Sequence, residues 1–235
     1  MEPRKAFRMI YPKQLRRDEY FSTPIWMADA PQLVKNLNKA SDPYIKESKK
    51  ALKKGIATRN KTYGNKGDMG NVFHSKSLIE DNKFKDLSLY ILQTSENLLK
   101  EMGFSLDDHK LFITELWVQE FAKQGAGWHS THAHWNGHIS GFMFLKASDR
   151  TSVPTFHDPR TGNLMNLLPL KTTNAVKPGV HSVTYKPTPG RMIFFPSYLA
   201  HEYIPDMGYD PFRFIHWNVQ AIPKGVLYKV KEFNK

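Results

Sequence analysis

The chain has 235 residues, of which 40% are hydrophobic and 13% aromatic, so a sizeable core is available and the composition argues against global disorder. The absence of cysteine excludes disulfides, thiolate nucleophiles and cysteine-based metal sites. The net charge is +12, and residues 1–100 hold 20 Lys and Arg against 11 Asp and Glu. We interpret this excess as a solvated lysine-rich surface, not as a nucleic-acid site. Neither a long apolar span nor a secretory signal is evident, so we expect no membrane segment and a cytoplasmic location.

The first hundred residues predict a layer of helices. Residues 29–40 show apolar positions at helical spacing, and a second helix is expected over residues 41–54, where Gly55 follows. Residues 56–77 are polar and rich in glycine, which predicts a long loop. Residues 77–102 carry the clearest apolar stripe and predict the best helix of the chain.

Beyond Leu111 the apolar period changes from helical to the two-residue alternation of strands, with Gly, Pro, Asp and Asn clusters between segments. Helices followed by six or more strands indicate an α+β chain, mainly β, with helices outside a β-sandwich or barrel. We expect a single domain over residues 1–235, with a helical buttress at about 20–103 and a β core at about 110–222. The expected strands are residues 111–121, 132–146, 153–157, 181–186, 190–195 and 212–221.

Histidines gather in one segment. The chain has ten, and four of them are His129, His132, His134 and His138. Alternate residues of a strand share a face, so His132 and His134 are predicted to point the same way. Two imidazoles in that arrangement can bind one metal in neighbouring positions, although imidazole suits iron, zinc, copper and nickel alike.

His201 is the candidate for the third ligand, because an apolar strand over residues 191–195 delivers it to a sheet edge. Three protein ligands would leave metal positions open for substrate and oxygen. Arg213 follows on the last strand, which contains no acidic residue. An arginine in a β-lined pocket is a two-pronged partner for a carboxylate, so we expect Arg213 to meet a ligand carboxylate and not a protein one.

The order of these motifs resembles the 2-oxoglutarate/iron(II)-dependent dioxygenases, and most closely the 2OG-Fe(II) oxygenase family of phages and bacteria. The likeness covers roughly residues 20–222 and rests on several motifs in one order. The motifs are Thr23-Pro24-Ile25, Leu116-Trp117-Val118-Gln119, His132-Ala133-His134, Ser140-Gly141, Asp158-Pro159-Arg160, Phe195-Pro196-Ser197 ahead of His201, and Arg213 leading to Asn218.

The resemblance implies a double-stranded β-helix of the jelly-roll or cupin type that binds iron(II) at His132, His134 and His201. The family's usual Asp or Glu is here His134. Two readings therefore remain open: a neutral three-histidine site, which we favour, or a site in which an anion such as Asp158 or a water completes the set. His129 and His216 are expected near the metal ligands or the substrate.

The resemblance also implies 2-oxoglutarate as co-substrate with O2, its far carboxylate on Arg213 and His138 and Asn218 nearby. The implied reaction couples oxidative decarboxylation of 2-oxoglutarate to oxidation of an organic substrate, in most cases a hydroxylation. That substrate is expected to be a small molecule or a protein side chain. If the chain is encoded by a phage, the expected cytoplasmic location is the cytoplasm of the host.

A second class of function has the same fold. A cupin-like metal-binding protein, or a three-histidine dioxygenase that does not use 2-oxoglutarate, would also place histidines in a β-helix. Arg213 discriminates, because such a protein has no need of a buried arginine after its last ligand. The basic first half keeps a nucleic-acid demethylase as a narrower alternative.

Overall fold

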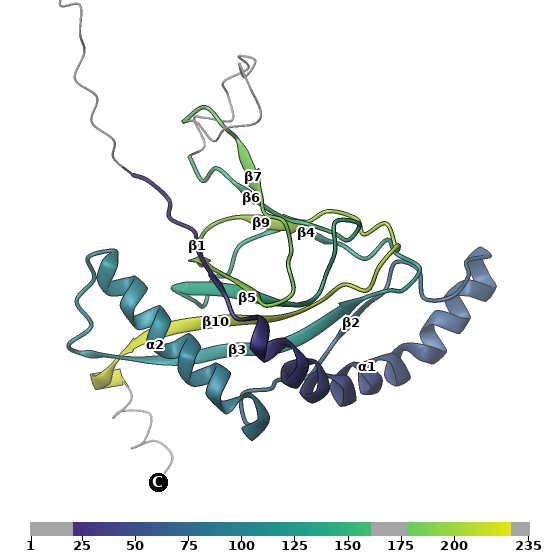
Figure 1. Ribbon diagram of the computed structural model, residues 1–235, viewed down its shortest axis with the longest axis horizontal. Coiled ribbons are helices and arrows are strands. Elements are labelled where there is room, and N and C mark those ends of the chain that lie inside the picture. The colour runs from purple at the N-terminus through teal and green to yellow at the C-terminus, as the bar shows by residue number, and fades with distance from the viewer. Residues whose placement is uncertain (1–20, 161–177, 227–235) are drawn as a thin grey trace, which may run out of the picture.

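The computed structural model describes residues 21–160 and 178–226, which form two facing antiparallel sheets with helices on one side (Figure 1). The larger sheet has six strands in the order β1-β8-β5-β10-β3-β2, and the smaller has four in the order β4-β9-β6-β7. From β3 to β10 the chain crosses repeatedly between the sheets, which is the winding of a double-stranded β-helix, as predicted. The strands are β1 (Trp26–Asp29), β2 (Val72–His74), β3 (His109–Phe121), β4 (His129–His132), β5 (Ile139–Lys146), β6 (Pro154–His157), β7 (Ser182–Thr184), β8 (Arg191–Pro196), β9 (His201–Tyr203) and β10 (Arg213–Pro223).

Two helices cover the outer face of the larger sheet, on the side away from the smaller sheet (Figure 1). The second helix, α2, buries Leu87, Ile91 and Leu98 in the same cluster as Ile215 and Trp217 of β10. The prediction that its apolar stripe lies against a sheet is therefore confirmed. The helical elements are η1 (Pro31–Leu33), α1 (Val34–Tyr63), η2 (Asn82–Phe84) and α2 (Lys85–Glu101).

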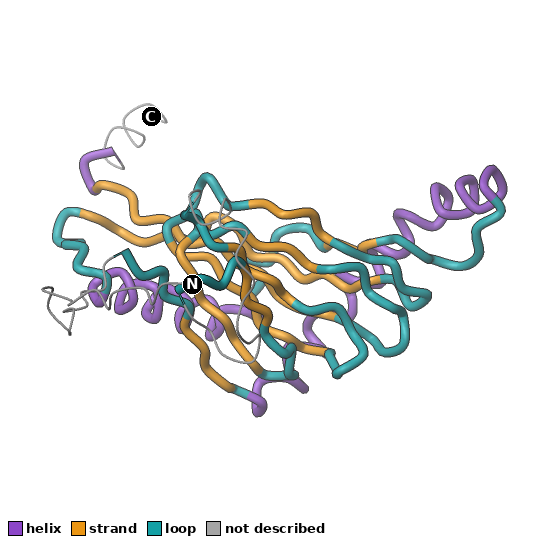
Figure 2. The backbone as a smooth tube through the Cα atoms, turned by 90° about the horizontal axis from the view of Figure 1, so that it is seen from above, coloured by secondary structure: helices purple, strands orange, loops and turns teal. Residues whose placement is uncertain are grey.

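The first helix, α1, is one helix of 30 residues where the sequence predicted two helices and a loop. It passes through Pro43 and Gly55 and ends at Gly64, whose φ of 69° is left-handed. Proline and glycine disfavour a helix interior, but Leu37 and Ile45, on either side of the proline, are buried. Packing on the sheet therefore keeps this part helical, while the C-terminal part of α1 projects beyond the sheets (Figures 1 and 2). Neither described helix is long and apolar enough to cross a bilayer.

The strand predicted over residues 132–146 is in fact two strands with a turn between them. β4 ends at His132 and β5 begins at Ile139, so His134 lies in the connection and not on a strand face. A side chain at Gly137 would approach the Ser197 hydroxyl to 2.6 Å, so glycine allows this connection to pass close to the end of β8. Strands β1, β2 and β9 and most of β4 were not predicted, because a segment of three or four residues shows a period only weakly.

Aromatic side chains fill the space between the sheets. Phe195 and Phe156 contact His201, with ring centroids 4.7 and 5.8 Å away. The histidine cluster therefore borders a close-packed aromatic core that leaves little room for water. The buried members of this core are Phe121, Phe142, Phe144, Phe156, Ile193, Phe195, Leu199, Tyr203, Phe212 and Phe214.

Candidate metal centre

His132, His134 and His201 converge at one end of the smaller sheet, with one ligand nitrogen from each within 4.8 Å of the other two. His132 and His201 lie opposite each other in the ladder between β4 and β9. His134 arrives differently: its backbone N–H donates to the Ser197 carbonyl at 2.9 Å. A loop hydrogen bond, not strand alternation, therefore brings the His134 ring to the other two.

Backbone carbonyls orient two of the three rings. The Nδ1 atom of His132 lies 2.7 Å from the Ser130 carbonyl, and that of His201 lies 3.0 Å from the Leu199 carbonyl. Each Nδ1–H can donate to its carbonyl, which leaves the Nε2 lone pair free for a metal. His134 places Nδ1 at 3.2 Å from the Asn218 amide, and its Nε2 is buried without a hydrogen-bond partner.

His134 and His201 are held in their neutral, metal-binding form. Burial, together with the neighbouring His132, lowers the pKa of His134 to about 4 and that of His201 to about 3. Neutral imidazoles can bind a dication at neutral pH without first losing a proton. Three imidazoles and open positions suit iron(II), so the residues present fit the metal that the motif order implied.

A row of neighbouring, tilted aromatic rings leads from β2 to this centre. His74, Trp117, His216 and His134 follow one another with ring centroids 4.2, 4.5 and 4.6 Å apart. Burial lowers the pKa of His216 well below its usual value. Because its ring lies next to that of His134, His216 adjoins the predicted ligands, as expected.

His129 is held by β3. Its Nε2 lies 2.6 Å from the Gln119 amide, and burial lowers its pKa to about 4. His129 adjoins the three predicted ligands from β4, but it is not one of the possible metal ligands found among the described residues.

Glu115 is the carboxylate that the sequence reading missed. Glu115, His134 and His216 form a second group whose ligand atoms lie within 4.8 Å of one another. The available signal was the alternation along β3, which places Glu115 on the same face as Trp117 and Gln119. Asp158, named as a possible anion, instead pairs with Arg160 at 2.6 Å and belongs to neither group.

The expectation that no protein carboxylate meets Arg213 is wrong. Arg213 is 3% exposed, and its guanidinium lies 2.7 Å from Glu120 on β3 and 2.7 Å from Asp42 on α1. The strand segment itself has no acidic residue, but β3 and α1 supply them through tertiary packing. Arg213 therefore lies on the helix side of the sheet, with Ile215 and Trp217 in the adjoining core, and its donors already have partners.

Of the two other residues expected near the co-substrate, one lies in the centre and one at its rim. Asn218 is buried, accepts from the Ser140 hydroxyl at 2.6 Å and contacts His134. His138 is exposed, and its Nδ1 accepts from the Ala221 N–H at 3.1 Å. Asn218 can therefore orient a ligand, whereas His138 faces an adjoining pocket.

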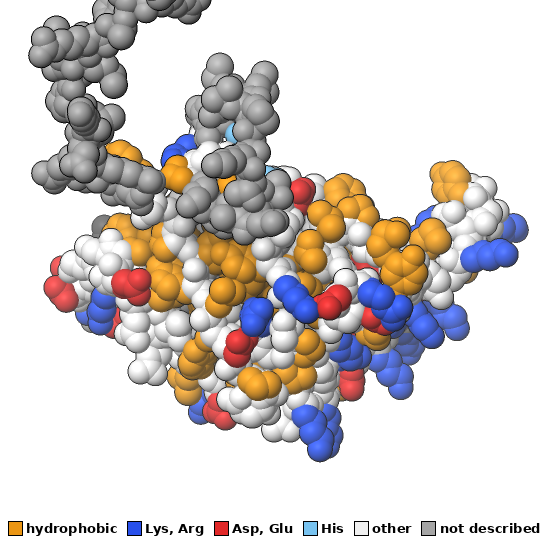
Figure 3. Space-filling view, turned by 45° about the horizontal axis from the view of Figure 1, so that its top comes forward, with side chains coloured by type: hydrophobic (Ala, Val, Ile, Leu, Met, Phe, Trp, Pro, Cys, Tyr) orange, Lys and Arg blue, Asp and Glu red, His pale blue; other side chains and the backbone are white. Residues whose placement is uncertain are grey.

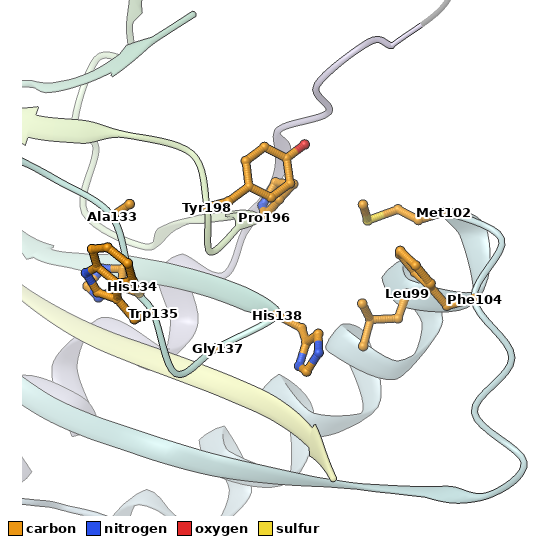
Figure 4. A pocket seen from close by; sticks show the side chains of 10 residues that line it. All are labelled: Leu99, Met102, Phe104, Ala133, His134, Trp135, Gly137, His138, Pro196 and Tyr198. Atoms are coloured by element: carbon orange, nitrogen blue, oxygen red, sulfur yellow. The ribbon is translucent and has the colours of Figure 1, made fainter. Parts of the chain in front are cut away.

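That pocket has a volume of about 400 Å³ and lies between the connection after β4, the end of β8 and the end of α2. Figure 4 shows Tyr198 and Pro196 on one side and Leu99, Met102 and Phe104 on the other. Its wall includes His134, and the residues that line it carry no Lys, Arg, Asp or Glu. The pocket therefore suits an uncharged, largely apolar group beside the candidate metal centre. The remaining lining residues are Ala133, Trp135, Gly137 and His138.

A comparison with known protein families gives a match over the part of the chain that contains the three histidines. Residues 115–213 match the sequence profile of a family described as "Putative 2OG-Fe(II) oxygenase". That range contains all three histidines of the first group and ends at Arg213. No curated protein matches the chain.

Solved structures are similar to this chain at low sequence identity. The non-heme alpha ketoglutarate dependent epimerase SnoN from nogalamycin biosynthesis is 11% identical with a TM-score of 0.53, over 84% of this chain and 76% of that one. A prolyl-4-hydroxylase from Pseudomonas putida is 11% identical with a TM-score of 0.49, over 84% and 93%. AviO1 from Streptomyces viridochromogenes Tue57 is 14% identical with a TM-score of 0.49, over 84% and 90%.

Proposed function

We propose that this chain is a 2-oxoglutarate- and iron(II)-dependent oxygenase that holds its iron on His132, His134 and His201 and acts as a hydroxylase. The match of residues 115–213 to the 2OG-Fe(II) oxygenase profile supports this proposal. The observation that carries the proposal is the convergence of the three ligand nitrogens within 4.8 Å. When bound, the iron with 2-oxoglutarate and O2 supplies the oxidising chemistry, and 2-oxoglutarate leaves as succinate and carbon dioxide.

The chain's own residues bind, orient and exclude water. The carbonyls of Ser130 and Leu199 fix the rings of His132 and His201, so the metal ligands are already oriented before metal binds. Phe195 and Phe156 pack against His201 and keep the buried side of the site dry.

Arg213 is not assigned to the far carboxylate of 2-oxoglutarate. Among the described residues it is the one Lys or Arg that is buried, and Glu120 and Asp42 already neutralise it. Asn218 remains a candidate for the near end of the co-substrate, because its amide lies beside His134. We assign the pocket of Figure 4 to the organic substrate, with its apolar part between Leu99 and Tyr198.

The test is anaerobic titration with iron(II) and then 2-oxoglutarate, followed by a succinate assay in air. Replacing His132, His134 or His201 by Ala should each weaken iron binding by tenfold or more, because a facial site holds metal poorly on two ligands. His109→Ala is the matched control, since His109 lies at the start of β3 and outside both groups of possible ligands.

The same experiment separates the two function classes. The visible charge-transfer band of an iron–2-oxoglutarate complex, with succinate formed in air, supports the proposal. An iron-loaded protein that neither binds 2-oxoglutarate nor yields succinate would overturn it. That outcome would favour a three-histidine dioxygenase or a cupin-like metal protein. In such a protein Arg213 needs no ligand carboxylate, because Glu120 already pairs with it.

A further inference from the structure

A second set of possible ligands adjoins the proposed iron site and includes a carboxylate. Glu115 on β3 and His216 on β10 lie on neighbouring strands, where Glu115 pairs with Asn218 and His216 pairs with Trp117. Their ligand atoms and one nitrogen of His134 lie within 4.8 Å of one another. Two imidazoles and a carboxylate form a common donor set for divalent transition metals.

His216 independently indicates that something binds there. The residue is 2% exposed, and its Nε2 is buried without a hydrogen-bond partner. The Glu115 carboxylate is 4.0 Å away, which is beyond hydrogen-bond distance. Buried polar atoms in folded proteins are nearly always satisfied, so an unpaired nitrogen aimed at a carboxylate suggests a ligand between them.

The carboxylate of Glu115 is held toward this position by two weak contacts. The Trp117 indole N–H lies 3.4 Å from one oxygen, and the Asn136 amide lies 3.4 Å from the other. The Glu115 side chain is 38% exposed. A cation can therefore reach the position from solvent, whereas His216 closes it on the inner side.

We propose that Glu115, His134 and His216 form a second position for a divalent transition-metal cation, which competes with the first position for His134. The competition follows from the His134 ring. Its Nδ1 lies 3.2 Å from the Asn218 amide nitrogen, and we assign Nε2, which has no hydrogen-bond partner, to the metal at either position. One nitrogen lone pair serves one ion at a time. A cation at the second position therefore withdraws a ligand from the proposed iron, and excess Zn²⁺ inhibits the enzyme through Glu115.

The second position rests on the proposed function only in naming the site with which it competes. Its test uses Co²⁺ as the probe, because Co²⁺ binds the same ligands and its visible spectrum reports the donor set. His201→Ala removes a ligand of the first position alone. We expect this variant to bind one Co²⁺, and the double variant His201→Ala/Glu115→Gln to bind it at least tenfold more weakly.

Glu96→Gln in the His201→Ala background is the matched control. Glu96 lies on α2, pairs with Lys100 at the surface and takes no part in either position. Circular dichroism of each variant shows whether the fold is retained. Equal Co²⁺ affinity in His201→Ala with and without Glu115→Gln overturns the second position.

The outcomes distinguish the two proposals. If His201→Ala loses all Co²⁺ binding, the second position is refuted while the three-histidine site stands. If Glu115→Gln alone abolishes binding and His201→Ala does not, the second position stands and the three-histidine site is refuted. A Glu115→Gln enzyme that tolerates at least tenfold more Zn²⁺ before losing activity supports the competition for His134.

Discussion

The two faces of strand β10 show two different uses of buried polar groups. On the helix side, Arg213 is buried but has two carboxylate partners within 2.7 Å. On the inner side, His216 is equally buried, and its Nε2 has no partner. On the outer face the buried charge of Arg213 is therefore neutralised without a ligand, and its ion pairs stabilise the fold. The inner face holds nitrogen atoms that a metal would satisfy, as expected of a binding site.

The largest expected effect on stability comes from removing Arg213 on the outer face of β10. Arg213→Ala removes one of the three cations that meet the buried Glu120, while Lys49 at 2.5 Å and Lys146 at 3.4 Å remain, so we expect a loss of about 1.5–3 kcal/mol in the free energy of unfolding, as for hydrogen bonds to a charged group. Urea denaturation measures it. Arg191→Ala is the control: Arg191 pairs with the half-exposed Asp29 and should cost about 0–1 kcal/mol.

The same variant also tests the assignment of function to the two faces. In the absence of urea, and at a temperature where the Arg213→Ala variant remains folded, its affinity for iron(II) should equal that of the wild type. A variant with normal stability but a large loss of 2-oxoglutarate affinity would return Arg213 to the co-substrate site.

A smaller effect, on metal affinity, is expected from removing a side chain that orients His134 on the inner face. Asn218→Ala removes the amide beside His134 and the acceptor of the Ser140 hydroxyl. Groups that orient a metal ligand typically change metal affinity about 10–100-fold when removed, so iron(II) titration should show a loss of that size. Asn60→Ala, on the projecting part of α1, should leave iron affinity unchanged. Unaltered affinity in Asn218→Ala would mean that the loop alone positions His134.

The inner face should also give a pH dependence. The pKa of His201 is about 3 in the folded chain against an ordinary 6.5, so the unfolded chain takes up its proton first as the pH falls. The metal-free protein should lose stability below about pH 6.5, by about 1.4 kcal/mol per pH unit for this residue. Above that pH the contribution is constant. Urea denaturation of His201→Asn across the same range should give a shallower slope, and equal slopes would contradict the burial of a neutral ring.

The smallest expected effect concerns nucleic acid. Blue side chains gather at the side of the molecule where α1 projects (Figure 3), and exposed lysines there include Lys46, Lys50, Lys53 and Lys54. We predict only weak binding to duplex DNA that disappears at moderate salt, as for any lysine-rich surface. Electrophoretic shifts over a salt series measure it. Salt-resistant binding with a sequence preference would instead favour a nucleic-acid substrate.

The sequence by itself determined the class of fold and the three histidines of the first site. Alternating apolar residues and turn clusters predicted the longer strands, and the stripe of α2 predicted which face it buries, because these periods are local consequences of backbone geometry. The order of motifs predicts that His132, His134 and His201 lie together, and the fold brings one ligand nitrogen of each within 4.8 Å of the others.

Only the tertiary structure decided the partners of buried polar groups. Arg213 meets Glu120 and Asp42 because β3 and α1 pack beside β10, and no reading of the β10 segment alone could find those carboxylates. His134 reaches the centre through a loop hydrogen bond to Ser197 that strand alternation does not contain. Glu115 joins His134 and His216 for the same reason. Periodicity is set within a segment, whereas the partner of a buried charge is set by which segments the fold brings together.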